Sequence, residues 1–426
     1  GDLGVREGYA VVSLAWLSIG IAGAVPFLLT GVVSSPTSAL FEAVSGFTTT
    51  GATVFSEIES LPHGILFWRN FTQWIGGMGI IVLGVAILPF LGVGGMQLFR
   101  AEVPGPTPER LRPRIAQTAK VLWYVYAGLT AAQVVLYLLG GLGPFDAVTH
   151  AFTTLSTGGF SPKNASIAAF DSPYVQYVTI LFMYLAGVSF TLHYLALRRG
   201  FSGYGESSEW RFFTFLVAGA ALLLLGSLLV GGHGEGSFEA TFRAALFQAV
   251  AISTTTGFVT ADYELWGLGA QLLLVLLMFV GGMAGSTGGG MKAVRVHTLV
   301  RHGFTELRKS IHPRAVILTR IGRRALGEDV LLRILAFVLL YLLLFAAGVL
   351  ALAFLGHDLA TSVGASAATI GNIGPGIGEV GAVDNYGWMS PVTHLLLTFL
   401  MLAGRLEIFT VLLLFHPELW RRRGGY

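Results

Sequence analysis

The sequence contains no cysteine, and only 12% of its 426 residues are charged. The first absence excludes disulfide bonds and thiolate metal sites, and no pair of histidines has the spacing of metal ligands. The second excludes an ordinary soluble domain, in which about 25% of residues carry a charge. Because 54% of the residues are hydrophobic, the composition indicates a membrane protein. No Ser/His/Asp set is apparent for hydrolysis, so we do not expect an enzyme.

Long apolar runs are present instead, and a run of roughly twenty residues is enough for a helix to cross a bilayer. We expect eight such spans in four pairs, at approximately 9–30 and 66–91, 119–140 and 173–198, 212–231 and 266–284, and 331–355 and 388–415. The apolar segment inside each pair, such as 39–47, is too short to cross. Non-helical backbone at that depth must be buried by protein or lined by water, so re-entrant loops are predicted.

Basic residues are concentrated on one side of these spans. The segments before each first span and after each second span hold 22 of the 26 Lys and Arg residues. The segments within the pairs hold twelve acidic residues and only three basic ones: Arg69, Lys163 and Arg243. Since basic loops face the cytoplasm, both termini are predicted to be cytoplasmic and the acidic outer mouth to concentrate cations. The basic segment 292–330 reflects either this bias or a docking surface for a cytoplasmic partner.

One stretch of sequence occurs twice almost unchanged. Residues 39–51 read ALFEAVSGFTTTG and residues 245–257 read ALFQAVAISTTTG, so nine of thirteen positions are identical. Weaker copies end at Gly158 and Gly374, and the four end glycines are separated by 107, 99 and 117 residues. A fixed period dictates architecture. The sequence therefore predicts an all-α membrane protein of four tandem helix–pore-loop–helix repeats around one pseudo-fourfold pore, with units at 1–118, 119–209, 210–330 and 331–426.

Each copy offers backbone carbonyl groups that could face the pore axis. A ring of carbonyls replaces the hydration shell of K⁺, and it requires backbone angles that glycine tolerates best. The C-terminal end of each short helix favours a cation nearby. A single such stretch would be a turn between helices, but four at matching places favour an ion filter. The predicted filter residues are Thr48, Thr49, Thr50 and Gly51; Leu155, Ser156, Thr157 and Gly158; Thr254, Thr255, Thr256 and Gly257; and Gly371, Asn372, Ile373 and Gly374.

The second spans also correspond to one another, at Gly77, Gly187, Gly282 and Gly404. Arg405 then follows the last glycine where the other units have Met or Val. A charged residue at membrane depth is expensive and is by default a functional hypothesis. We expect Arg405 to face the pore below the filter as a barrier to cations. The alternative is a structural pair with Glu407, although residues two apart on a helix do not face each other.

The third of these spans is interrupted by residues 281–292, of which six of twelve are glycine. A helix interior loses about 1 kcal/mol for each glycine, so the helix is predicted to break and to leave a flexible gate. A phosphate-binding loop is the competing interpretation, but it lacks the Ser or Thr after the lysine and has no preceding strand. The predicted gate residues are Gly281, Gly282, Gly285, Gly288, Gly289, Gly290, Lys292 and Arg405.

Several motifs together carry a family resemblance. They are FEAVSGFTTTG at 41–51, QWIGGMG at 73–79, LGVGGMQ at 91–97 with AEVPG at 101–105, HAFTTLSTGGF at 150–160, and NIGPG at 372–376. With them, the chain resembles the TrkH branch of the Trk/Ktr/HKT potassium transporter superfamily over essentially its whole length. TrkH-type chains usually carry two further helices before the first unit, and this sequence begins directly at that unit.

The resemblance implies one K⁺ pathway through the four units and assembly as a homodimer. It implies that the filter glycines confer K⁺ preference; plant relatives with Ser in the first unit favour Na⁺. It also implies that Arg405 and the loop 281–292 are the constriction and the gate. The family works with a cytoplasmic ring of TrkA-type nucleotide-binding subunits, which would meet the basic loops.

We therefore predict potassium uptake across the inner (plasma) membrane of a bacterium. Passage is expected to be channel-like, since an entering cation gains about 2.3 kcal/mol per 100 mV of membrane potential, and to be gated by the cytoplasmic ring. Alternatives are a proton- or sodium-coupled potassium carrier and a membrane-bound regulatory protein that does not conduct. The expected contacts are the transported potassium ion, membrane lipid and protein partners, with no organic cofactor and no nucleic acid.

Overall fold

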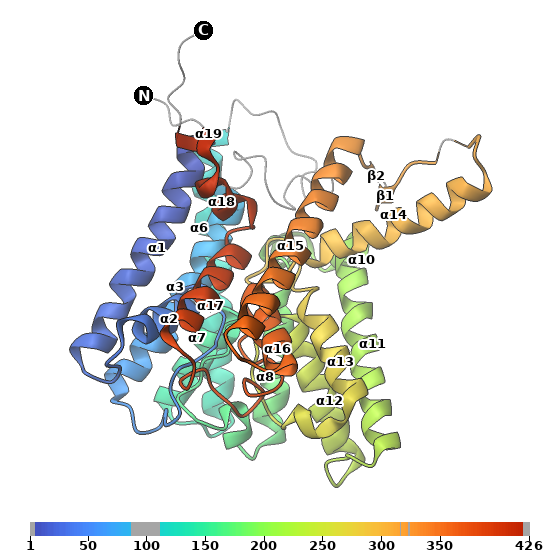
Figure 1. The fold of residues 1–426 in the computed structure, drawn as a ribbon. Coiled ribbons are helices and arrows are strands. Elements are labelled where there is room, and N and C mark those ends of the chain that lie inside the picture. The colour runs from blue at the N-terminus through green and yellow to red at the C-terminus, as the bar shows by residue number, and fades with distance from the viewer. Residues whose placement is uncertain (1–4, 87–110, 316, 323, 421–426) are drawn as a thin grey trace.

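The computed structural model describes residues 5–86, 111–315, 317–322 and 324–420 (Figure 1). Nearly all of its regular structure is helical, and one two-residue antiparallel hairpin pairs β1 (Arg320–Ile321) with β2 (Arg324–Ala325). The chain enters at α1 and leaves at α19 (Pro417–Trp420) at the same end of the bundle. Both termini of a membrane protein can lie on one side of the membrane only if the chain begins and ends at the same end of the bundle. That this side is the cytoplasm stays a prediction. The motifs at 91–105 and the basic residues 421–423 lie outside the described residues.

One pattern of helices occurs four times. The long first helices are α1 (Val5–Leu29), α6 (Leu111–Leu139), α11 (Ser208–Gly231) and α15 (Glu328–Phe354). The short pore helices are α2 (Pro36–Phe47), α7 (Pro144–Leu155), α12 (Phe238–Ser253) and α16 (Leu359–Ile370). The second helices are α3 (His63–Ala86), α8 (Pro173–Gly187), α13 (Leu268–Met278) and α17 (Pro391–Arg405). The predicted all-α repeat architecture is confirmed, while the unit boundaries stay a prediction; all three fall inside first helices, in α6, α11 and α15.

The four first helices form the membrane-facing part of the bundle. Each of them is long and apolar enough to cross a bilayer. Their outward side chains are large, apolar and exposed, for example Leu139, Val230 and Phe354. In a soluble protein such a surface would be a liability, whereas in a bilayer the lipid covers it.

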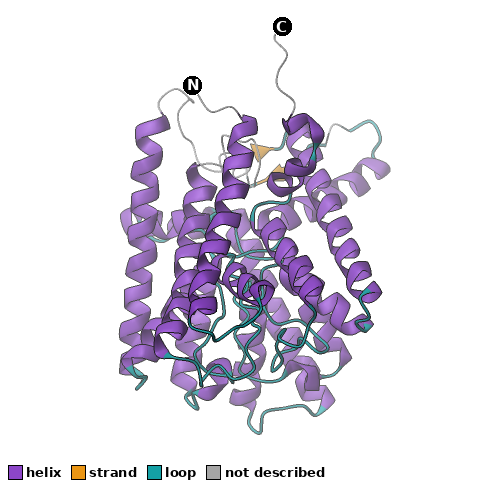
Figure 2. Cartoon of the chain, turned by 60° about the vertical axis from the view of Figure 1, so that its left-hand side comes forward, coloured by secondary structure: helices purple, strands orange, loops and turns teal. Residues whose placement is uncertain are grey.

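Three of the four pore helices, α2, α12 and α16, begin at a side-chain cap, and all four end just before a residue with a positive φ angle. The hydroxyl of Ser237 accepts a hydrogen bond from the backbone N–H of Ala240, and the carboxylate of Asp358 accepts two from the first turn of α16. Such caps satisfy N–H groups that have no partner inside the helix. The C-terminal half of each pore helix is buried. The loops that follow lie inside the lower half of the bundle, enclosed by helices (Figure 2).

The second helices break more often than the sequence predicted. α8 continues as α9 (Phe190–Arg199) after a bend of 97°, and α17 continues as α18 (Phe409–Leu412) and η4 (Leu413–Phe415) after a bend of 118°. The predictions of continuous helices over 173–198 and 388–415 are therefore wrong. At the second break Glu407 and Ile408 have positive φ angles of 65° and 35°, which an α-helix cannot contain.

The interruption of the third second helix is confirmed. α13 ends at Met278, residues 279–292 form a loop, and α14 (Ala293–Ile311) follows. Figure 1 shows α14 extending sideways from the bundle at the end that carries the termini. The remaining short elements are η2 (Ser166–Ala169), α10 (Ser202–Glu206) and η3 (Tyr263–Trp266).

Candidate ion pathway

Four residues after each pore helix adopt the same backbone path, and we call these segments the pore strands. The first residue of each caps the helix, and the second has a positive φ angle. These second residues are Thr49, Thr157, Thr255 and Asn372, with φ of 53°, 54°, 61° and 54°. A non-glycine residue in this region costs of order 1–3 kcal/mol and is found mostly at functional sites. The pore strands are therefore residues 48–51, 156–159, 254–257 and 371–374.

This register corrects the prediction for the second unit. Leu155 is the last residue of α7, and Gly158 lies at the third position, not the fourth. Its N–H bonds to the carbonyl of Thr153, as the N–H of Thr50 bonds to that of Ser45. The fourth position belongs to Gly159, with a φ angle of 77°. An alignment without gaps cannot decide between two adjacent glycines, and the end of α7 decides it.

The four strands close into a ring. A Cβ atom at Gly51 would lie 2.2 Å from the carbonyl oxygen of Gly158, and one at Gly159 would lie 2.0 Å from that of Thr256. A Cβ atom at Gly257 would lie 1.8 Å from the carbonyl oxygen of Ile373, and one at Gly374 would lie 2.7 Å from that of Thr50. Each fourth-position glycine thus abuts the third-position carbonyl of the next strand. Glycine is required there for space as well as for its φ angle of 71° to 102°.

The ring presents carbonyl oxygens, and most threonine hydroxyls are engaged locally. Alternation of right- and left-handed residues turns successive carbonyl groups to the same side of a strand. The hydroxyl of Thr48 donates to the carbonyl of Val44 at 2.7 Å and lies 2.7 Å from the hydroxyl of Thr50. Thr254 and Thr256 repeat this contact at 2.8 Å. The strands therefore offer mainly neutral backbone oxygens, to which the C-terminal ends of four helices add negative potential.

The glycine-rich loop packs directly against the third and fourth strands and against the C-terminal end of α7. Gly290 N–H donates to the carbonyl of Gly371 at 3.0 Å, and Gly289 N–H donates to the hydroxyl of Thr255 at 2.6 Å. The hydroxyl of Thr287 donates to the carbonyl of Leu155 at 2.9 Å. The predicted gate residues therefore lie next to the predicted filter residues. Thr287 was missed, because nothing in its local sequence distinguishes it.

Arg405 reaches the same loop. It is 3% exposed, and its Nη1 donates to the carbonyl of Thr287 at 2.9 Å. Its Nε and Nη2 have no hydrogen-bond partner among the described residues. The alternative pair with Glu407 is wrong, because Glu407 forms its ion pair with Arg295 of α14. Lys292 also holds the loop, by donating to the carbonyl of Gly288.

The position of Arg405 in the repeat also needs a correction. A Cβ atom at Gly76 would lie 2.0 Å from the last carbonyl oxygen of its pore helix, and one at Gly404 would lie 1.9 Å from the corresponding oxygen. Gly404 therefore corresponds to Gly76, and Arg405 corresponds to Gly77. A one-residue shift along a helix turns a side chain by about 100°, so only the packed structure sets this register.

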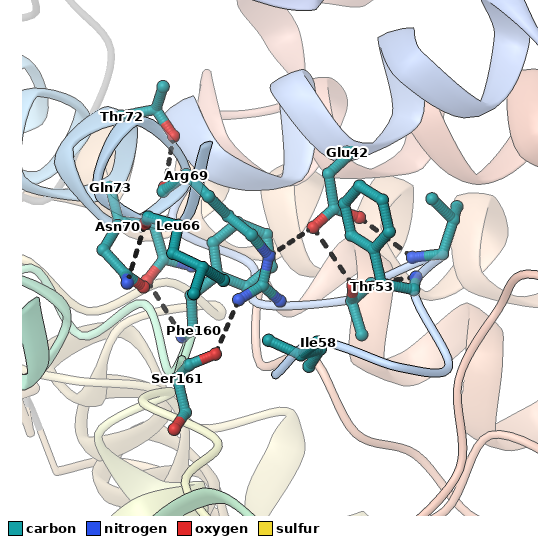
Figure 3. Close-up of polar contacts among 12 residues, drawn as sticks. Glu42, Thr53, Ile58, Leu66, Arg69, Asn70, Thr72, Gln73, Phe160 and Ser161 are labelled. Carbon is teal, nitrogen blue, oxygen red and sulfur yellow. Dashed lines mark hydrogen bonds and ion pairs between the residues drawn. The ribbon is translucent and has the colours of Figure 1, made fainter. Parts of the chain in front are cut away.

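A buried ion pair lies beside the chain segments that follow the first and second strands (Figure 3). Nε of Arg69 donates to the carboxylate of Glu42 at 2.6 Å, and both side chains are almost fully buried. The same carboxylate accepts hydrogen bonds from Thr53 and Val54 at 3.1 and 2.9 Å. The pair thus connects pore helix α2 to α3 and to the chain that leaves the first strand.

The guanidinium of Arg69 also contacts the chain beyond the second strand. Its Nη1 donates to the carbonyl of Ser161 at 2.9 Å, and it lies 3.6 Å above the ring of Phe160. The orientation rule predicted an outer position for Arg69 but no role. The repeat does contain a signal for this pair, because the position that holds Glu42 in the first unit holds the neutral Gln248 in the third.

An acidic pocket lies between the third and fourth units. It is lined by Glu264, Gln271, Asp358, Gly378, Glu379, Asp384 and Trp388. Partial burial raises the pKa of Glu264, and the nearby carboxylates of Asp262 and Asp384 raise it further, while the N–H of Gly378 acts in the opposite direction. Acidic side chains therefore gather in one pocket of the described surface, where their charge attracts cations, while the outward orientation of this pocket stays a prediction.

Comparison with known proteins agrees with this geometry. A family model described as TrkH, cation transport protein, matches residues 2–422. The Trk system potassium uptake protein TrkH of Vibrio parahaemolyticus is 44% identical over 99% of this chain and 87% of its own length. TrkH of Escherichia coli strain K12 is also 44% identical, with the same coverage, and TrkG of that strain is 35% identical.

The fold agrees as well. The crystal structure of the potassium transporter TrkH from Vibrio parahaemolyticus matches with a TM-score of 0.91 and 42% identity, over 99% of this chain and 87% of that one. The match extends over all four units, which include the pore strands, the glycine-rich loop and Arg405. On these grounds the chain belongs to the TrkH family of cation transport proteins.

Proposed function

We propose that this protein takes up potassium ions across the inner membrane of a bacterium. The observation that carries the proposal is the closed ring of third-position carbonyls, each set beside a glycine that leaves room for nothing larger. Oxygen atoms in such a ring replace the hydration shell of K⁺. The names of the relatives, potassium uptake proteins of the Trk system, support the same ion.

Passage is channel-like, and the loop 281–292 with Arg405 forms the gate. Hydrogen bonds from Gly290 to the fourth strand and from Thr287 to the end of α7 hold the loop in place, and Arg405 of α17 donates a further one to the loop. The positive charge of the buried Arg405 guanidinium repels any cation that approaches it closely. Flow then requires the loop to move away from the strands, and the membrane potential supplies the driving force. A proton- or sodium-coupled carrier would instead show flux that depends on a second ion gradient.

The movement is driven by a cytoplasmic nucleotide-binding ring that docks on α14. This helix begins directly after the loop, so a displacement of α14 pulls on the gate. It exposes apolar side chains, among them Phe304 and Leu307, beside the basic residues Arg301 and Arg308. A surface of this composition suits a protein partner with an acidic rim. Assembly as a homodimer is part of the same proposal.

The test is flux of K⁺ and Na⁺ into proteoliposomes, with and without the cytoplasmic ring. The wild type should prefer K⁺, and Gly51→Ser should lose most of that preference because its side chain meets the carbonyl of Gly158. Gly219→Ser is the matched control, since Gly219 lies in α11 with nothing within 4 Å of its Cβ position. Equal selectivity in Gly51→Ser and Gly219→Ser would place the filter elsewhere.

A further inference from the structure

The second pore strand lacks a side chain that the other three possess. The third position is Thr50, Thr256 and Ile373 in three units but Gly158 in the second. Since Gly159 follows, this strand contains two consecutive residues without a Cβ atom. Such a peptide has the greatest freedom to rotate, and rotation would turn its carbonyl oxygen out of the ring.

Gln73 of helix α3 occupies the missing space. A Cβ atom at Gly158 would lie 2.3 Å from both Cδ and Oε1 of Gln73 and 2.8 Å from its Nε2. Gln73 is fully buried, so its amide must find partners within the protein. The neighbouring helix thus supplies the volume that a side chain on the strand supplies in the other units.

The same amide holds the strand at two points. Its Nε2 donates to the carbonyl of Gly158 at 2.7 Å, and its Oε1 accepts from the N–H of Phe160 at 3.0 Å. Figure 3 shows Gln73 beside Phe160, next to the Arg69 network. The two hydrogen bonds bracket the flexible Gly158–Gly159 peptide and restrict its rotation.

The corresponding residues of the other units are not amides. With the register set by Gly77, Gly187, Gly282 and Arg405, the residue four positions earlier is Gln73, Met183, Met278 and Met401. A methionine side chain has no N–H group to donate and only a weak acceptor, so it cannot hold a strand as Gln73 does. In the first and third strands the hydroxyl at the third position contacts the one at the first, at 2.7 and 2.8 Å.

We propose that Gln73 is the positioning residue that determines the ion selectivity of the second pore strand. It acts on the ion only through the carbonyl of Gly158, which it aims into the ring and whose oxygen it partly engages. The proposal rests on the proposed function, because it requires the ring to be the filter. On this proposal, the geometry of the second strand is determined by a residue of the neighbouring helix α3.

The test uses the full chain in proteoliposomes and measures the ratio of K⁺ to Na⁺ flux. Gln73→Met places the residue of the other three units at this position; it fills the space but removes both hydrogen bonds. We expect the K⁺ preference to fall about tenfold, the equivalent of one lost buried hydrogen bond, with an unchanged melting temperature to within a few degrees. Met183→Leu is the control and should keep the wild-type ratio.

A compensating pair makes the test independent of folding defects in any single variant. Gly158→Thr alone should fail, because its side chain meets Gln73. The double variant Gln73→Ala/Gly158→Thr rebuilds the arrangement of the first and third strands and should recover the K⁺ preference to within about threefold of the wild type, about 0.7 kcal/mol.

Two results would overturn the inference: a wild-type flux ratio in Gln73→Met, or a double variant no better than Gly158→Thr. If the wild type itself shows no K⁺ preference, or Gly51→Ser does not change it, the proposed function fails instead. The two failures are therefore distinguishable within one set of flux measurements.

Discussion

The buried pair of Glu42 and Arg69 allows the most quantitative prediction. Glu42→Gln keeps the shape of the side chain and an oxygen for the N–H of Val54, but it removes the negative charge. The guanidinium of Arg69, 1% exposed, would then be buried without a counter-charge. Breaking one half of a buried ion pair costs about 3–5 kcal/mol. We expect Glu42→Gln to lower the free energy of unfolding by that amount.

The measurement is denaturant unfolding in detergent micelles, followed for both single variants and for the double variant. Arg69→Met should be as harmful as Glu42→Gln, because it leaves the carboxylate unpaired. The double variant should lose much less than the sum of the two, since neither charge is then stranded. The control pair is Glu306 and Lys309, which is joined at 2.8 Å but whose side chains are 49% and 43% exposed.

The corresponding substitutions at the control pair should change stability little, because exposed ion pairs are screened by water and salt. The reasoning is refuted if Glu42→Gln unfolds within about 1 kcal/mol of the wild type, as a surface pair would. It is also refuted if the two single losses simply add in the double variant, since that would show no coupling between the charges.

Three further predictions follow from the pathway and its mouth. Arg405→Ala should increase K⁺ flux in a protein that still elutes as a folded species, and an unchanged flux would remove its role as a barrier. Gly159→Ala should abolish selective flux, whereas Gly219→Ala should leave it intact; equal behaviour of the two would contradict the corrected register. Because burial raises the pKa of Glu264 above 4.5 in the folded protein, its charge opposes folding at neutral pH. Glu264→Gln should therefore raise the melting temperature at pH 7. The gain should shrink as the pH falls towards 4.5, because the carboxyl group then becomes protonated in the folded and the unfolded protein alike. A gain that persists at low pH would speak against this cause.

The repeat in the sequence was enough to predict the architecture. Four copies of one pattern, each between apolar runs, leave few arrangements that bury the polar backbone of the loops. The copies at 39–51 and 245–257 also put two pore strands at the same position of the repeat, because α2 and α12 end at the corresponding residues Phe47 and Ser253. The glycines at 281–292 predicted a broken helix from propensity alone.

Other features depended on the packed structure. Gly158 and Gly159 are equivalent in local sequence, and only the end of α7 and the neighbouring carbonyl of Thr256 assign the fourth position. The breaks after Gly187 and Arg405 have no comparable run of glycine. At the first break the chain bonds to the glycine-rich loop instead, with the N–H of Met283 donating to the carbonyl of Gly187 at 2.9 Å and the N–H of Phe190 donating to that of Gly285 at 3.0 Å. A sequence pattern records local preference, and tertiary packing overrides it.

The partners of the buried polar residues show the same division. The sequence by itself predicted that Arg405 lies at membrane depth and put Arg69 and Gln73 within the apolar run 66–91, where a buried polar group must be satisfied. It did not determine that Arg405 meets Thr287, that Arg69 meets Glu42, or that Gln73 meets Gly158. Those partners lie 118, 27 and 85 residues away along the chain. Only the closure of four repeats around one axis brings them into contact.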